Sequence, residues 1–222
     1  MKLNNQEISA RIEENWKALN DEVDKIVDES GKLKPKIITV SKTRSIEEIE
    51  IAYDLGIRDF GENYAQELGQ KAKLLPNANW HFIGHLQRGN AKYIVPFCDM
   101  LHTLDSTKLA RRLFNLSFRS PILIQIKMGT ELSKSGIIWD LTIIENLLKE
   151  VKEIGLKVVG LMGIGSLSWD RDQTLNQFSR LAKLNHKLGL SELSIGMSDD
   201  YLEAILAGST MIRIGTKIFG PR

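Results

Sequence analysis

The sequence predicts a (β/α)8 barrel of the TIM type, an α/β fold, and three observations lead to that prediction. Short apolar or β-branched segments alternate with segments of helical periodicity, which is the pattern of parallel βαβ units. Eight such units follow one another at a spacing of about 25 residues, and 222 residues is near the lower size of a closed barrel. An open doubly wound sheet is the alternative, but no G-x-G-x-x-G motif follows any predicted strand.

The composition indicates a globular protein with a sizeable core. Apolar residues make up 42% of the chain and charged residues 26%, which excludes a disordered or fibrous chain. The net charge is only +2 and no basic run exceeds two residues, which argues against a nucleic-acid binder. The single cysteine, Cys98, excludes an intramolecular disulfide and fits a reducing compartment. No apolar run reaches the roughly 20 residues of a membrane span, and the N-terminus is polar, so we expect a cytoplasmic protein.

The first element is expected to be an amphipathic helix over residues 1–30 that packs on the barrel. Gly31 ends this helix, and Pro35 favours extended chain after it. Its apolar residues, which recur at steps of three or four, are Ile8, Ile12, Trp16, Leu19, Val23 and Ile26. No change of composition and no linker divides the chain, so we expect residues 1–222 to form one domain.

The eight predicted strands are the segments 37–41, 57–60, 80–83, 100–103, 121–127, 156–161, 193–196 and 210–214. Among the intervening helices, Ser45 and Glu48 have the spacing of a capping box that opens a helix reaching Gly56. Asn63 and Gln66 are expected to open the next helix in the same way. Helical periodicity also covers residues 142–154 and 173–188.

The loops after the seventh and eighth predicted strands have the features of a phosphate site. In such barrels these two loops often bind phosphate, with help from a helix N-terminus. Ser198 is expected to cap a helix that begins at Asp199, with free backbone amides behind it. Gly215 and Thr216 follow the last strand, where a glycine lets backbone amides approach a ligand oxygen. The alternative is that Ser198 only caps a helix and Gly215 only makes a tight turn.

Lys42 directly follows the first predicted strand. Closure of the barrel makes that strand the neighbour of the eighth, which places Lys42 beside the phosphate loops and Arg213. Desolvation and a nearby guanidinium would lower the pKa of the lysine amine and favour Schiff-base chemistry. A phosphate site next to an imine-forming lysine suggests pyridoxal phosphate. The alternatives are a solvated surface lysine and a lysine that only pairs with the phosphate.

The histidines do not indicate a metal site. No cluster of carboxylates accompanies them in the sequence, so no metal is expected. His81 lies within a predicted strand and is interpreted as a hydrogen-bonded core histidine, whereas His85 follows the strand and could face a cleft. Asn63 could likewise only start a helix, or it could present its amide to a ligand.

Several long motifs match one known family. They are Val40–Thr43, Phe60–Glu67, His81–Gly84, Leu86–Gln87, Lys134–Gly136, Gly160–Met162, Ser194–Asp200, Ala207–Thr216 and Ile218–Gly220. Over essentially its whole length the sequence resembles the pyridoxal phosphate homeostasis protein family (the YggS/PROSC type). The resemblance implies a fold-type III barrel similar to the N-terminal domain of alanine racemase.

The resemblance also implies the roles of individual residues toward pyridoxal 5'-phosphate as cofactor. Lys42 would form the Schiff base and Arg213 would face the pyridine nitrogen. Phosphate contacts are implied for Ser198, Gly215 and Thr216, and ring contacts for Asn63 and Met197. The segment 87–92 departs from the family pattern, because Gly89 and Asn90 stand where Asn and Lys are usual. We therefore assign no ligand contact to that segment.

The resemblance favours a carrier that buffers or delivers pyridoxal phosphate and maintains vitamin B6 and amino-acid homeostasis, without efficient catalysis of its own. The chain ends at Arg222, just after the eighth unit, so we expect no second domain of the kind that supplies an acid–base residue in racemases. The tyrosines Tyr53, Tyr64, Tyr93 and Tyr201 all fall in predicted helical segments, so none is an obvious replacement. An arginine at the ring nitrogen also weakens the electron sink, although racemases of this fold use one too.

The alternative function is a pyridoxal phosphate-dependent amino-acid racemase or related enzyme. The expected partners of a carrier are pyridoxal phosphate and the apo forms of enzymes that use it. We expect no nucleic acid or membrane partner, and we expect a monomer.

Overall fold

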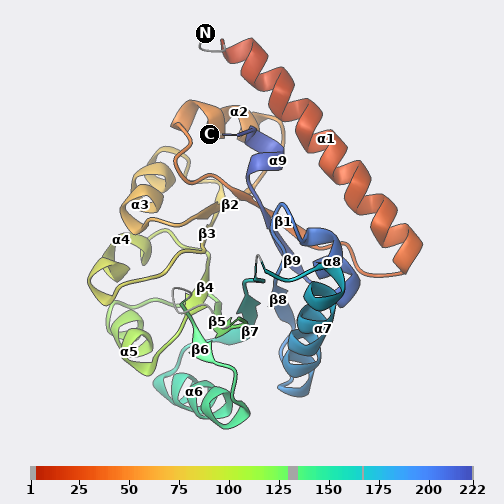
Figure 1. Cartoon of the computed structure of the whole chain (residues 1–222). Coiled ribbons are helices and arrows are strands. Elements are labelled where there is room, and N and C mark those ends of the chain that lie inside the picture. Colours follow the sequence, from red (N-terminus) through yellow and green to blue (C-terminus); the bar gives the residue numbers. More distant parts are fainter. Residues whose placement is uncertain (1–3, 130–134, 167, 222) are drawn as a thin grey trace.

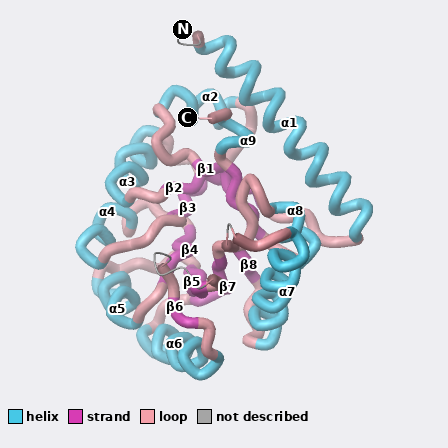
Figure 2. The backbone as a smooth tube through the Cα atoms, in the orientation of Figure 1, coloured by secondary structure: helices cyan, strands magenta, loops and turns pink. Residues whose placement is uncertain are grey.

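Eight parallel strands close into a barrel in the computed structural model of the chain, which describes residues 4–129, 135–166 and 168–221. The strand order around the barrel is β4-β3-β2-β1-β9-β8-β7-β5, and pairing of β4 with β5 completes the ring. The helices surround the strands on the outside (Figures 1 and 2). The predicted TIM-type barrel is therefore confirmed. Lys134, the first residue of the Lys134–Gly136 motif, lies outside the described residues.

The strands are β1 (Lys36–Val40), β2 (Asp59–Glu62), β3 (Asn79–Phe82), β4 (Met100–Leu104), β5 (Ile122–Lys127), β6 (Ile137–Ile138), β7 (Val158–Gly163), β8 (Glu192–Ser194) and β9 (Met211–Ile214). All eight predicted strands are present, with ends that differ by at most two residues. The additional strand, β6, pairs with the end of β5. Its two residues are too few to show any periodicity in the sequence.

The helices are α1 (Asn5–Ser30), α2 (Ile46–Asp54), α3 (Ala65–Leu74), α4 (Ala91–Ile94), α5 (Thr107–Asn115), α6 (Leu141–Ile154), α7 (Arg171–Lys187), α8 (Tyr201–Ala207) and α9 (Thr216–Phe219), with a 3-10 turn η1 (Arg88–Asn90). The capping box of Ser45 and Glu48 is confirmed at the start of α2. The other two predicted helix starts are wrong. The helix α3 begins after Tyr64, and no side chain caps it. The helix α8 begins after Asp200.

Each wrong helix start has a local reason. The amide oxygen of Asn63 is buried and makes no hydrogen bond among the described residues, so it does not reach back to the amides of α3. Ser198 lies in a turn, and its hydroxyl accepts a hydrogen bond from Thr216 instead of capping α8. Neither side chain thus caps the helix that it was expected to open.

The helix α1 ties the start of the chain to its end. It begins with a capping box of Asn4 and Glu7 and buries Ile12, Leu19 and Val23. It packs against α2, α8 and α9, along one side of the barrel (Figure 1). The amide of Asn15 also donates to the carbonyl oxygen of Ile218 in α9, at 3.0 Å. The helix therefore supports the last two βα units, whose loops form part of the site described below.

The two faces of each strand lie in different cores. Ile38, Leu123, Met162 and Met211 form a small apolar cluster inside the barrel. A much larger apolar cluster fills the space between the strands and the outer helices. Since successive side chains of a strand point to opposite faces, each strand contributes to both.

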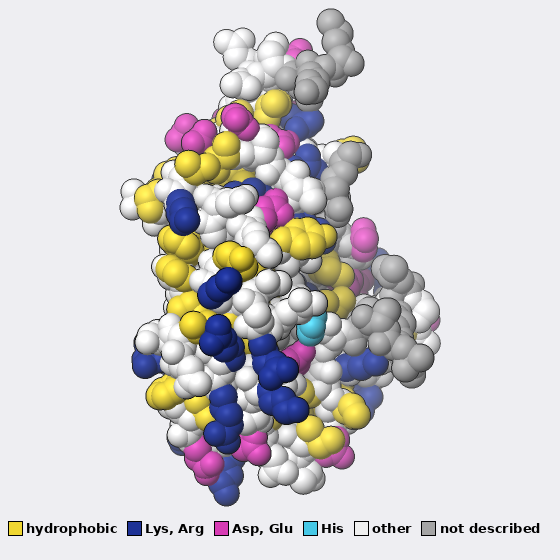
Figure 3. Space-filling view, turned by 90° about the vertical axis from the view of Figure 1, so that its left-hand side faces the viewer, with side chains coloured by type: hydrophobic (Ala, Val, Ile, Leu, Met, Phe, Trp, Pro, Cys, Tyr) yellow, Lys and Arg dark blue, Asp and Glu magenta, His cyan; other side chains and the backbone are white. Residues whose placement is uncertain are grey.

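The near-neutral net charge conceals an uneven distribution of charged side chains. On the face formed by α3, α4 and α5, lysines and arginines gather over α4 and α5 (Figure 3). The exposed side chains there include Lys92, Lys108, Arg111 and Arg112, which are separated in sequence. Among the described helices, none is long and apolar enough to cross a membrane.

Candidate functional site

The carboxyl ends of β1 and β9 meet at one point of the barrel rim. The two strands pair in parallel, from Lys36 opposite Met211 to Thr39 opposite Ile214. A Cβ atom on Gly215 would lie 3.2 Å from the carbonyl oxygen of Val40, so the loop after β9 packs directly on the end of β1. Lys42, half-buried, follows two residues later. The structure thus brings the predicted lysine and the predicted phosphate loop to the same place.

Two hydroxyl groups face each other in this part of the rim. Thr216 Oγ1 donates a hydrogen bond to Ser198 Oγ at 3.1 Å, which joins the loops after β9 and β8. Met197, next to Ser198, donates its backbone amide to Asp200 Oδ1 at 2.6 Å. Burial raises the pKa of Asp200, although this hydrogen bond and the charge of Arg213 act in the opposite direction. The paired hydroxyls are accessible to solvent, so they can donate to the oxygens of an anion.

Arg213 lies inside the barrel, just below the rim, with 3% of its surface exposed. One guanidinium nitrogen donates to the carbonyl oxygen and the hydroxyl of Ser194, at 2.8 and 2.7 Å. The other donates to the carbonyl oxygen of Gly163 at 3.0 Å. Burial lowers the pKa of Arg213 to about 10, so the side chain is still a cation at neutral pH.

Asn63 contributes a polar atom that lacks a partner. It follows β2, and Gly84 packs so closely on it that a Cβ at Gly84 would lie 2.1 Å from the Asn63 carbonyl oxygen. Within the described residues, Oδ1 of Asn63 is buried without a hydrogen bond. An unpaired buried acceptor costs about 1–3 kcal/mol, so such an atom at a barrel rim fits a place where a polar ligand binds.

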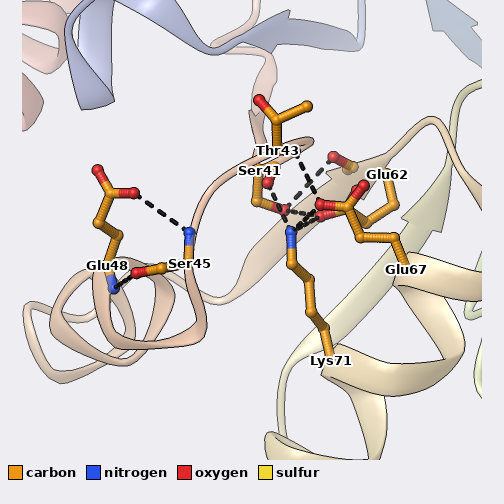
Figure 4. Close-up of polar contacts among 8 residues, drawn as sticks. Ser41, Thr43, Ser45, Glu48, Glu62, Glu67 and Lys71 are labelled. Atoms are coloured by element: carbon orange, nitrogen blue, oxygen red, sulfur yellow. Dashed lines mark hydrogen bonds and ion pairs between the residues drawn. The ribbon is translucent and has the colours of Figure 1, made fainter. Parts of the chain in front are cut away.

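A buried charge cluster lies beneath the loop that carries Lys42 (Figure 4). Lys71, from α3, donates to the carbonyl oxygen of Ser41 at 2.8 Å. The same ammonium group pairs with Oε1 of Glu62 at 2.8 Å and Oε1 of Glu67 at 2.6 Å. Burial raises the pKa of Glu62, while Lys71 and the hydroxyl of Ser41 act to lower it.

This cluster holds the backbone on both sides of Lys42. The carbonyl of Ser41, on the N-terminal side, accepts from Lys71. The amide of Thr43, on the C-terminal side, donates to Glu67 Oε1 at 2.8 Å (Figure 4). Thr43 also has φ 64°, a left-handed conformation that is costly for a threonine and needs such support. The two peptide groups that flank the Lys42 Cα atom are therefore both fixed.

The histidines are distributed as the sequence indicated. His81 is 3% exposed and hydrogen-bonds within the barrel, which confirms the interpretation as a core histidine. His85 is largely exposed, and its Nδ1 lies 3.5 Å from Oδ2 of Asp105. In the part of the chain that the structure describes, no group of three or more His, Cys, Asp or Glu side chains could hold a metal ion.

Sequence reasoning did not find the Lys71 cluster. One signal was present, since Glu67 and Lys71 have the i, i+4 spacing of an ion pair on a helix. That spacing is common on exposed helices and does not reveal that the pair is buried against Ser41 and Glu62.

Comparisons with known proteins agree with this fold. The family described as alanine racemase, N-terminal domain, matches residues 10–222. A pyridoxal phosphate homeostasis protein from Mus musculus is 41% identical, over 86% of this chain and 78% of that protein. PipY of Synechococcus elongatus PCC7942, solved with PLP bound, is 30% identical with a TM-score of 0.80, over 94% of this chain and 100% of PipY. Alanine racemase from Bacillus anthracis shares the fold, with a TM-score of 0.72 at 15% identity, over 96% of this chain and 56% of the racemase.

We predict that Lys71→Met lowers the free energy of unfolding by about 3–5 kcal/mol at neutral pH, because the carboxylate of Glu62 is then buried without a cation. Burial raises the pKa of Glu62 in the folded protein. The charged form of Glu62 therefore destabilises the folded variant at neutral pH, and the deficit should shrink as the pH falls from neutral toward acidic values and Glu62 takes up a proton. Urea denaturation across that range measures both effects.

The matched control is Lys73→Met, which removes an exposed lysine from the same helix and should cost well under about 1 kcal/mol. Equal losses for the two variants, or a Lys71→Met deficit that does not change with pH, would contradict the role assigned to the cluster.

Proposed function

The chain belongs to the alanine racemase N-terminal domain family, among the pyridoxal phosphate homeostasis proteins, and from this premise we propose that it binds pyridoxal phosphate and buffers or delivers it. The observation that carries the proposal is the meeting of the Lys42 loop with the Ser198–Thr216 hydroxyl pair at the seam between β1 and β9. A primary amine beside an anion site matches the two reactive ends of this cofactor. That the related PipY was solved with PLP bound supports the same assignment.

Each predicted residue has a place in such a complex. When bound, pyridoxal phosphate supplies an aldehyde that reacts with primary amines. The amine of Lys42 would add to this aldehyde and release water, which leaves a carbon–nitrogen double bond between protein and cofactor. The hydroxyls of Ser198 and Thr216 would donate to the phosphate, and Gly215 leaves space for its own backbone amide to do the same.

The ring of the cofactor would lie between Asn63 and Met197. The unpaired amide oxygen of Asn63 would then find a partner among the polar ring substituents. Arg213 would donate to the ring nitrogen. Since a guanidinium cannot accept a proton, this contact keeps the nitrogen unprotonated and limits how well the ring can stabilise a carbanion.

These features support a carrier rather than an efficient enzyme. The relatives carry a name that describes homeostasis of the cofactor. Tyr53, Tyr93 and Tyr201 lie in helices rather than at strand ends, where a catalytic acid–base group would lie, whereas Tyr64 is exposed in the loop between β2 and α3. The apo forms of pyridoxal phosphate enzymes are the proposed recipients. An amino-acid racemase remains the alternative, because the family is named after one.

Borohydride reduction tests the covalent link. The purified protein, incubated with pyridoxal phosphate, should absorb in the visible range, and reduction should leave a pyridoxyl group on the peptide that contains Lys42. Mass spectrometry of the digest locates the group. Lys42→Ala should abolish the adduct, whereas Lys92→Ala, at an exposed lysine, should not. An adduct that maps to Lys71, or no adduct in the parent protein, would refute the assignment of Lys42.

The phosphate site can be tested with Ser198→Ala. A hydrogen bond to a charged group contributes roughly 1.5–3 kcal/mol, so this change should weaken pyridoxal phosphate binding about ten-fold or more. Pyridoxal, which lacks the phosphate, should bind the variant and the parent alike in an equilibrium titration. Ser191→Ala, an exposed serine just before β8, is the control. If Ser198→Ala distinguishes the two ligands as well as the parent does, the phosphate lies elsewhere.

The distinction between carrier and enzyme can be made in heavy water. We expect the loaded protein, incubated with single L-amino acids, to exchange the α-proton no more often than about once per protein molecule, because Arg213 at the ring nitrogen limits how well the ring can stabilise a carbanion. NMR of the amino acid measures the exchange, and alanine racemase is the positive control. Transfer of the cofactor to an apo-enzyme should be measurable in parallel. Exchange over many turnovers would identify an enzyme.

A further inference from the structure

A chain of five polar side chains crosses the interior of the barrel. It begins at Asp59, at the start of β2, and continues through His81 Nε2 at 3.0 Å. His81 Nδ1 lies 3.0 Å from His102 Nε2, and His102 Nδ1 lies 2.9 Å from Ser194 Oγ. The chain ends at Arg213, whose guanidinium donates to Ser194 Oγ at 2.7 Å. Four strands, β2, β3, β4 and β8, thus connect one end of the barrel to Arg213 on β9.

The two ends of this chain fix its direction. A guanidinium can only donate and an ionised carboxylate can only accept, so Arg213 and Asp59 define the donor end and the acceptor end. Burial, the largest cause, together with the electrostatic effects of His81 and of Arg213, holds the pKa of His102 well below its usual range, so this histidine is uncharged at neutral pH. An uncharged imidazole carries one N–H, which must be placed on one of its two nitrogens.

Only one arrangement uses every contact when both histidines are uncharged. His81 donates from Nε2 to Asp59 and accepts at Nδ1. His102 donates from Nε2 to His81 and accepts at Nδ1 from the hydroxyl of Ser194. The lone pairs of Ser194 Oγ are then directed at Arg213, and all four hydrogen bonds point from Arg213 toward Asp59.

The consequence concerns the position of Arg213. The guanidinium donates hydrogen bonds to the carbonyl oxygen and hydroxyl of Ser194 and to the carbonyl oxygen of Gly163. These three bonds lie on the side of the guanidinium that faces β7 and β8. Because the hydroxyl hydrogen of Ser194 is taken by His102, Ser194 Oγ remains a pure acceptor toward the guanidinium. Without His102 that hydroxyl could rotate and point its hydrogen at Arg213, which would weaken the contact.

We propose that His102 is a positioning residue, which acts through Ser194 to fix the guanidinium of Arg213 toward the ring nitrogen of pyridoxal phosphate, while Asp59 and His81 select the tautomer of His102. The inference rests on the proposed function. It assigns a role to a buried polar chain that runs beside the apolar cluster inside the barrel, where each partner must be satisfied for the network to be stable. The charged groups that face the chain at its ends are Lys36, 3.2 Å from Asp59, and Asp200, which acts on Arg213.

Nitrogen-15 NMR of the histidine rings tests the direction of the chain in the protein without cofactor. We expect His102 as an uncharged Nε2–H tautomer, with the two rings assigned from His81→Gln and His102→Asn. An Nδ1–H tautomer or a charged ring at His102 would overturn the proposal. This measurement does not depend on whether the protein binds pyridoxal phosphate.

Two ligands that differ only at the ring nitrogen test whether His102 positions the guanidinium of Arg213. The parent should bind pyridoxal phosphate about ten-fold or more tightly than the analogue in which the ring nitrogen is replaced by C–H, because the analogue cannot accept from the guanidinium. His102→Leu should reduce this preference to less than about three-fold and leave the affinity for the analogue unchanged. His102→Asn, which can still accept from Ser194 with Oδ1, should keep most of the preference.

Met162→Leu is the control, since it alters an apolar side chain inside the same barrel, beside Ser194 on the neighbouring strand, and removes no member of the polar chain. A purely structural role for His102 would lower the affinity for both ligands equally, and that result would overturn the proposal. Full preference in His102→Leu would overturn it as well. If the parent binds neither ligand, the proposed function itself is wrong, while the tautomer measurement still decides the direction of the chain.

Discussion

Pairing of β1 with β9 is the constraint on which the candidate site depends. These strands lie near opposite ends of the chain, and their backbone hydrogen bonds close the barrel. Closure places Gly215 against Val40 and so brings the loop after the last strand beside Lys42. The helix α1 reinforces this seam from outside, since it packs on both α2 and α9. An open sheet of the same strands would leave Lys42 at one edge and the Ser198–Thr216 hydroxyl pair at the other.

The alternation of side chains along the strands separates two polar networks that serve the same site. One lies inside the barrel and runs from Asp59 to Arg213 through two histidines and Ser194. The other lies between the barrel and α3, where Lys71 joins two glutamates to the backbone beside Lys42. Each network is buried and contains charges, so each stabilises the protein only while its partners remain in place. The inner network fixes Arg213 and the outer network fixes the backbone of Lys42.

The proposed carrier function combines a rigid base with an accessible rim. Lys42 extends from a backbone that is held on both sides, and Arg213 is almost fully buried, so neither needs to reorganise when the cofactor binds. The hydroxyls of Ser198 and Thr216 face solvent, and a phosphate held there can be reached by other molecules. Such a site can retain a reactive aldehyde and still release it to an incoming amine.

The sequence by itself determined the order of strands and helices, the barrel, and the rim position of Lys42, Ser198, Gly215 and Thr216. Periodicity and strand-end position are local properties, and eight βα units without a G-x-G-x-x-G motif favoured a closed barrel over an open sheet. The sequence did not show that Ser198 turns to Thr216 instead of capping α8, or that Asn63 leaves α3 uncapped, because each depends on a neighbour that is distant in sequence or on burial. Only the tertiary structure joined Lys71 to Ser41 and His102 to Ser194. Contacts between strands and helices far apart in the chain are set by packing, which no local pattern records.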